Sequence, residues 1–94
     1  MAVVGVHRWV LHLHGCRSLK EKRSVIRGMR DRMISRFKVS AAETGLQDRH
    51  AMAELTAAVA SSEKRHAESV LLKLDALVRS DPRATVVESE VAYF

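Results

Sequence analysis

The order of hydrophobic patterns along the chain is the feature that most limits its fold. Apolar residues recur at spacings of three and four in residues 17–38 and again between Ser62 and Ser80, which is typical of helices that bury one face. The segments between them have strand-like composition and alternation. These predicted strands are residues 3–13, 39–44, 51–60 and 85–94. The order of elements is therefore β-α-β-β-α-β.

This order predicts a ferredoxin-like α+β sandwich. Two helices with apolar stripes can cover one face of a four-stranded antiparallel sheet. Right-handed crossovers place the first and third strands at the centre of that sheet. Because 94 residues are enough for one hydrophobic core and too few for two, we expect residues 1–94 to form a single domain.

Alternation within the strands predicts which side chains face the helices. In the first strand, His7 shares the buried face with Trp9, Leu11 and Leu13. In the last strand, the expected inward residues are Val87, Val91 and Tyr93.

The opposite, open face of the sheet carries a mixed set of side chains and no aromatic one. RNA-recognition motifs of this fold stack bases on aromatic residues of the central strands, so we do not expect this face to read RNA bases. Apolar Val6 and Val10 lie there on a central strand, which leaves pairing with a second copy of the chain as an alternative use. The predicted outward residues are Arg8, Val10, His12, Glu54, Thr56, Glu88 and Glu90.

Positive charge is concentrated in the first predicted helix. The chain has 16 Lys and Arg against 11 Asp and Glu, a net charge of +5. Residues 17–38 alone hold nine basic and two acidic residues, which gives +7 and leaves −2 for the rest. If the protein binds a polyanion, we therefore expect this helix to make the contact.

Four cations of this helix fall on one arc beside its apolar stripe. At 100° per residue, Lys20, Arg23, Arg27 and Arg30 follow one another about one turn apart. Only Asp31 is placed to neutralise Arg27 at i+4. The arc is either a solvated helix face or a strip that contacts RNA phosphates, which Arg can grip with two hydrogen bonds. The nucleic-acid-binding residues predicted on the second interpretation are Arg17, Lys20, Arg23, Arg27, Arg30 and Lys38.

Two other polar residues of the helix have predicted structural roles. Ser18 followed by Glu21 fits a capping box at the start of the helix. Lys22 falls inside the apolar stripe, where its ammonium either reaches water from the edge of the core or pairs with a carboxylate such as Glu43. We expect the first arrangement.

No catalytic or metal site emerges from the remaining motifs. His12, His14 and Cys16 alternate as zinc ligands could, with His50 or His66 as a fourth ligand, but surface histidines at a strand end explain them as well. Cys16 has no identifiable base, the glycines are isolated, and no pair of catalytic carboxylates can be assigned. We therefore expect no enzyme activity, no cofactor, no metal and no identifiable small-molecule ligand.

Several segments together resemble the YlxP-like family of small bacterial proteins, a domain-of-unknown-function family. These segments are residues 4–6, 11–13, 17–23, 47–48 and 53–55. The resemblance implies a ferredoxin-like fold and, because the family's genes commonly lie among those for translation initiation and ribosome maturation, action near ribosomal RNA or its factors. The matching motif positions are Ser18, Leu19, Lys20, Glu21, Lys22, Arg23, Gln47 and Asp48. The chain departs from the family at His14, where proline is usual, and at Cys16, where a small residue such as alanine is usual.

The sequence favours one functional class and leaves another open. A single cysteine, no membrane-length apolar run and no signal-peptide pattern predict a cytoplasmic protein. The favoured function is non-enzymatic association with RNA or the ribosome through the first helix. The alternative is a homodimerising protein-interaction module that uses the open sheet face. An enzyme or small-ligand regulator is a third class, because fold alone does not set function.

Overall fold

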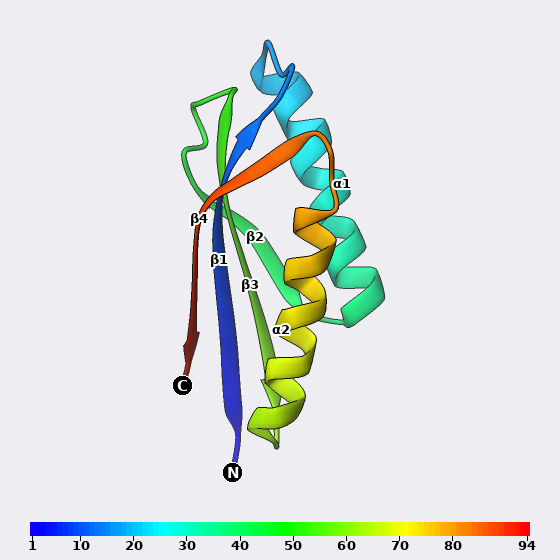
Figure 1. Cartoon of the computed structure of the whole chain (residues 1–94), viewed down its shortest axis with the longest axis vertical. Coiled ribbons are helices and arrows are strands. Elements are labelled where there is room, and N and C mark those ends of the chain that lie inside the picture. The colour runs from blue at the N-terminus through cyan, green and yellow to red at the C-terminus, as the bar shows by residue number, and fades with distance from the viewer.

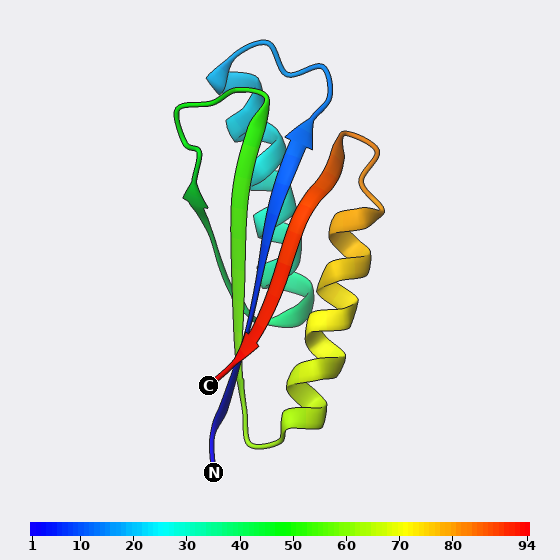
Figure 2. The same cartoon turned by 60° about the vertical axis from the view of Figure 1, so that its left-hand side comes forward.

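The computed structural model describes residues 1–94 and has the expected order of elements (Figure 1). The elements are β1 (Val3–Leu13), α1 (Leu19–Phe37), β2 (Ser40–Gly45), β3 (Met52–Ser61), α2 (Lys64–Arg79) and β4 (Ala84–Tyr93). The strands form one antiparallel sheet in the order β2-β3-β1-β4, with both helices on the same face (Figures 1 and 2). The predicted ferredoxin-like α+β sandwich is confirmed.

The core lies between this sheet and the two helices. β1 is hydrogen-bonded on both sides, so its helix-facing side chains lie at the centre of the core, where Trp9 and Leu11 are fully buried. Met29 and Met33 pack onto them from α1 and Leu74 from α2. The long strands make the molecule elongated, about 45 × 20 × 17 Å, with both chain ends near one tip (Figure 1). Neither helix is long and apolar enough to cross a membrane.

A β-bulge in β4 corrects one predicted strand face. Val10 pairs with Glu88, but the next residue of β1, Leu11, pairs with Val86, so Val87 is an extra residue in the ladder. Val86 packs against the core, and Val87 is 55% exposed. The expectation that Val87 faces the helices is wrong because strict alternation holds only in an unbroken ladder.

The start of α1 follows the predicted cap in part. Ser18 is the N-cap residue, and its Oγ accepts a hydrogen bond from the backbone N–H of Glu21 at 3.1 Å. The carboxylate of Glu21 accepts from the N–H of Arg17 at 2.7 Å rather than from that of Ser18. The reciprocal half of the capping box is therefore shifted by one residue.

Lys22 differs from its expected arrangement. Its side chain is only 1% exposed, and Nζ lies 2.9 Å from Oε2 of Glu43 on β2. Nζ also donates to the backbone carbonyls of Leu46 and Arg49, each at 2.6 Å. The expectation that the ammonium reaches water is wrong, because the β2–β3 loop closes over it with two carbonyl acceptors and β2 supplies the carboxylate of Glu43.

Candidate nucleic-acid interface and open sheet face

Three arginines of α1 surround one shallow hollow at the edge of the molecule next to β2. The hollow has a volume of about 230 Å³ and is lined by Arg23, Ile26, Arg27, Arg30 and Glu43. Arg23 and Arg27 are exposed, and the side chain of Arg30 is 41% exposed. The helical spacing therefore brings three arginines to the lining of one hollow, as the angular positions along the helix predict.

These cations have few carboxylate partners of their own. Arg23 and Arg27 make no ion pair or side-chain hydrogen bond. Asp31, which the spacing placed beside Arg27, approaches Nε of Arg30 instead, at 3.9 Å. That Nε is buried and has no hydrogen-bond partner. Glu43, the one carboxylate in the lining, is paired with Lys22. The hollow therefore presents a net positive charge.

The other predicted binding residues extend the basic surface along the helix. Lys20 is exposed one turn before Arg23. Arg17 precedes the N-cap, and Lys38 is the C-cap in the left-handed region with φ 54°. The 19 residues of α1 separate these two ends by about 30 Å, at 1.5 Å per residue. Arg17 and Lys38 therefore cannot contact the same phosphate as the central arginines.

The structure adds a basic residue that the sequence did not indicate. The Lys22 contact holds the backbone carbonyl of Arg49 against the first turns of α1, and the Arg49 side chain is exposed. In the same loop, Nε2 of Gln47 donates to the carbonyl of Glu43 at 3.1 Å, and Asp48 is exposed. The two separate motif segments, residues 17–23 and 47–48, thus meet in space. The only signal in the sequence for the contact between these segments was Lys22, a charged residue inside an apolar stripe.

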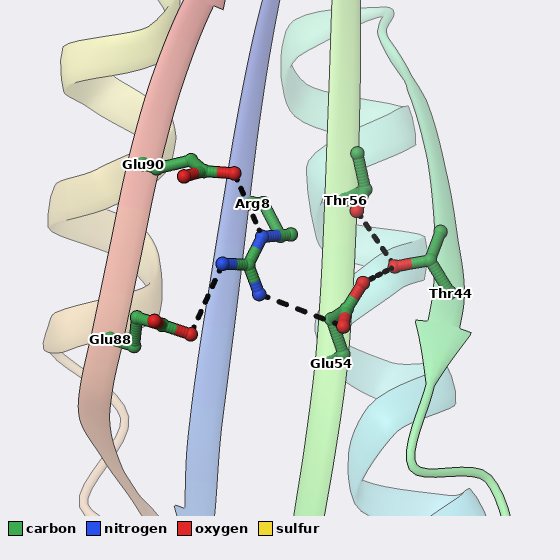
Figure 3. A network of polar contacts seen from close by, with 6 residues as sticks. All are labelled: Arg8, Thr44, Glu54, Thr56, Glu88 and Glu90. Atoms are coloured by element: carbon green, nitrogen blue, oxygen red, sulfur yellow. Dashed lines mark hydrogen bonds and ion pairs between the residues drawn. The ribbon is translucent and has the colours of Figure 1, made fainter.

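The open face of the sheet is organised around one arginine (Figure 3). Arg8 on β1 lies 3.1 Å from Glu88 and 3.2 Å from Glu90 on β4, and 3.6 Å from Glu54 on β3. Hydrogen bonds to Glu88 and Glu90 raise the pKa of the Arg8 guanidinium. Three carboxylates around one cation leave a net charge of −2 at the centre of this face.

Hydroxyl groups continue this network towards the edge strand. Thr44 Oγ1 on β2 donates to Oε1 of Glu54 at 2.7 Å and lies 2.7 Å from Oγ1 of Thr56 (Figure 3). The register confirms the seven residues that alternation placed on this face. None of them is aromatic, and the face is acidic where a nucleic-acid platform would be basic.

The histidines and the cysteine at the end of β1 do not converge. The rings of His12 and His14 meet edge to face with centroids 4.9 Å apart, and Nε2 of His14 lies 2.6 Å from Oγ1 of Thr85. Cys16 is half-buried against the core. No three His, Cys, Asp or Glu side chains are grouped so that they could hold a metal ion.

Comparison with known proteins assigns a family. The sequence matches the profile described as "Protein of unknown function (DUF503)" over residues 4–91. The chain belongs to the DUF503 family. No curated protein matches it.

Solved structures with the same fold place this DUF503 chain among ferredoxin-like proteins. The designed protein Foldit4 is 15% identical with a TM-score of 0.60, covering 100% of this chain and 97% of that one. A second designed protein, LFR1 1 with ferredoxin fold, is 16% identical with a TM-score of 0.57, covering 97% and 85%. SnoaB, a cofactor-independent oxygenase from Streptomyces nogalater, is 19% identical with a TM-score of 0.50, covering 99% and 90%. At these identities the likeness shows the fold alone.

Proposed function

We propose that this DUF503 protein is a YlxP-like, bacterial, cytoplasmic protein without enzymatic activity that binds ribosomal RNA through one helix. The contact surface is the basic strip, defined as Lys20, Arg23, Arg27 and Arg30. The observation that supports this proposal most directly is the hollow lined by three arginines of the strip, two of which make no ion pair.

The physical mechanism is electrostatic positioning on phosphates. An arginine can hold a phosphate with two parallel hydrogen bonds, and the exposed side chains of Arg23 and Arg27, which make no ion pair, are free to do so. Phosphate contacts orient a protein on RNA without reading its bases. Affinity should therefore depend weakly on sequence and fall as salt rises, with a logarithmic slope of about −0.7 per phosphate contacted on single strands.

The surroundings of the strip agree with a surface that lies against RNA. The acidic centre of the open face is on the other side of the sheet from α1 (Figures 2 and 3). RNA attracted to the helix is thus repelled from the opposite side, which favours one orientation. The gene neighbourhood implied by the YlxP-like resemblance points to the same partner.

Charge reversal tests the proposal. The variant Arg23→Glu, Arg27→Glu, Arg30→Glu should lose co-sedimentation with ribosomal particles at low salt and should bind ribosomal RNA with a shallower salt slope. The control is Arg36→Glu, Arg65→Glu, Lys73→Glu, because these exposed residues make no ion pair and the change in net charge is identical. Equal co-sedimentation of both folded variants would overturn the proposal.

An alternative function is homodimerisation through the open sheet face. Apolar side chains flank the Arg8 network there, and Val4 at the end of β1 is 37% exposed. A second copy could cover them, although two acidic centres of −2 would then face each other if the pairing were symmetric. A solution mass of twice 10.5 kDa, together with a shallow salt slope for RNA, would favour this alternative.

A further inference from the structure

A cavity of about 400 Å³ lies between α2 and the β1–β4 side of the sheet, away from the basic strip. It is lined by His7, Glu68, Leu71, Leu72, Asp75, Val91 and Tyr93. This volume is within the range of pockets that hold small molecules, about 300–1,000 Å³. Its lining combines an apolar wall with a few polar groups, as such pockets usually do.

The polar group that most needs explanation is His7. The residue is 5% exposed, its ring stacks on Trp9 with centroids 4.0 Å apart, and neither ring nitrogen has a hydrogen-bond partner. Nε2 lies 3.7 Å from Oδ1 of Asp75, too far for a hydrogen bond. Buried polar side chains nearly always have a partner, so an unpartnered imidazole lining a cavity suggests that a ligand supplies one.

The neighbours of His7 cannot supply that partner themselves. Asp75 Oδ1 already accepts from Nε1 of Trp9 at 2.9 Å and from Nε of Arg79 at 3.0 Å. Burial lowers the pKa of His7, and Arg79 adds to this, against the attraction of Asp75. The imidazole is therefore neutral at pH 7 and offers one donor and one acceptor.

The charge of the cavity selects the kind of polar group it would accept. Two carboxylates, Glu68 and Asp75, belong to the lining, and no Lys or Arg does. Asp75 is compensated by Arg79, but Glu68 makes no ion pair. A cationic or donor group is thus favoured over an anionic one.

The rim of the cavity carries apolar side chains that an apolar part of a ligand would contact. Leu72 on α2 is 72% exposed and Val91 on β4 is 46% exposed, so two apolar side chains at this cavity are open to solvent. They flank the cavity together with the half-buried Tyr93, whose ring also has the ammonium of Lys64 at 5.0 Å from its centroid. A ligand with an apolar body would cover both exposed side chains.

We propose that this cavity is a binding site for a small amphipathic amine. The amino group would lie between Glu68 and His7, with its apolar body against Leu72 and Val91. The site is independent of the basic strip on α1, so it adds a small-molecule function to the proposed RNA association.

Titration with matched probes, followed by nuclear magnetic resonance, tests this site. The probes are 2-phenylethylamine, 2-phenylethanol and 3-phenylpropionate, which differ mainly in their polar end. We expect the amine to shift the His7 ring and the Leu72 and Val91 methyl signals saturably and at lower concentration than the other two. The absence of saturable shifts with all three probes would overturn the site. Tighter binding of the alcohol or the carboxylate would overturn the assignment of an amine.

Variants of exposed residues test the geometry without disturbing the core. Glu68→Gln should weaken amine binding about fivefold, equivalent to ~1 kcal/mol, and Leu72→Lys should weaken it by placing a cation at the rim. Glu63→Gln, which removes the same charge at the N-cap of α2 outside the cavity, should leave it unchanged. Equal amine affinity in all three variants and the parent would contradict the proposal. Resonance dispersion like that of the parent serves as the check that each variant is folded.

Discussion

Lys22 and Glu43 form an ion pair of 2.9 Å between the first helix and the edge strand, with the ammonium almost completely removed from water. The same Nζ binds two carbonyls of the β2–β3 loop, those of Leu46 and Arg49. One lysine therefore ties three segments together: α1, β2 and the loop. Because β2 has only one neighbour in the sheet, β3, this contact also stabilises its free side.

Replacing Lys22 by methionine should lower the free energy of unfolding by about 3 kcal/mol, because it leaves Glu43 and two carbonyls without their buried partner. Lys20→Met, two residues earlier and exposed, should change it by no more than ~0.5 kcal/mol. Urea unfolding followed by circular dichroism measures both. Similar stability of the two variants would mean that water replaces the ammonium at little cost.

The architecture was predictable because the apolar pattern is regular where the core is. Met29 and Met33 lie at helical spacing and Trp9 and Leu11 at strand spacing, and all four are buried as their periodicity requires. The β4 bulge was not predictable, because alternation with Val91 and Tyr93 selects Val87, and its neighbour Val86 is the same residue type. Only the pairing with β1 decides which of them is buried.

Asp81→Asn should also destabilise the protein, by about 2 kcal/mol at pH 7. Hydrogen bonds from Arg83 lower the pKa of the Asp81 carboxyl from its ordinary value of 3.8 to about 2, and Arg32 contributes at 3.2 Å. The folded state thus holds this proton less tightly than the unfolded state. The stabilisation is present above pH 3.8 and is lost as the pH falls through about 2.

The measurement is the difference in unfolding free energy between parent and Asp81→Asn as a function of pH. Asp31→Asn, whose carboxylate is 62% exposed, serves as control and should stay within ~0.5 kcal/mol of the parent. A parent–variant difference that stays constant from pH 5 to pH 2 would contradict the role assigned to the Asp81–Arg83 pair.

His7 should make the protein less stable under mildly acidic conditions. Burial lowers its pKa below the ordinary value of 6.5, so the unfolded state takes up a proton that the folded state resists. Stability attributable to the neutral ring is complete above pH 6.5 and declines as the pH falls through the lower folded value. Asp75 and Arg79 act on the charge of this ring, and Glu68 lines the same cavity. All three are kept constant by comparing the parent with His7→Phe.

The comparison consists of unfolding curves between pH 8 and pH 5. The parent should lose stability relative to His7→Phe on acidification, because phenylalanine preserves the stack on Trp9 and does not titrate. Parallel pH profiles of the two proteins would show that the His7 ring is protonated in the folded state as easily as in the unfolded chain.

The candidate sites were predictable to different degrees for physical reasons. The basic strip follows from helical geometry alone, so Arg23, Arg27 and Arg30 meet where the sequence placed them. The cavity at His7 depends on how α2 packs beside the edge strand β4, and no local pattern encodes this packing. In the sequence, a histidine in line with Trp9 and Leu11 indicates only a buried position.

Arg8 should stabilise the sheet mainly by separating its acidic neighbours. In Arg8→Gln, the carboxylates of Glu54, Glu88 and Glu90 face one another across three adjacent strands without a cation (Figure 3). Like charges on neighbouring strands destabilise a sheet, and salt screens this repulsion. The melting temperature should therefore fall, and the decrease should be larger at about 10 mM salt than at about 500 mM salt.

Adding Glu88→Gln and Glu90→Gln to the Arg8→Gln chain should recover most of this decrease in melting temperature, whereas Arg65→Gln on the exposed surface of α2 should cause no decrease. A loss in Arg8→Gln that is independent of salt and unaffected by the two glutamine substitutions would instead assign the role of Arg8 to packing of its aliphatic stem.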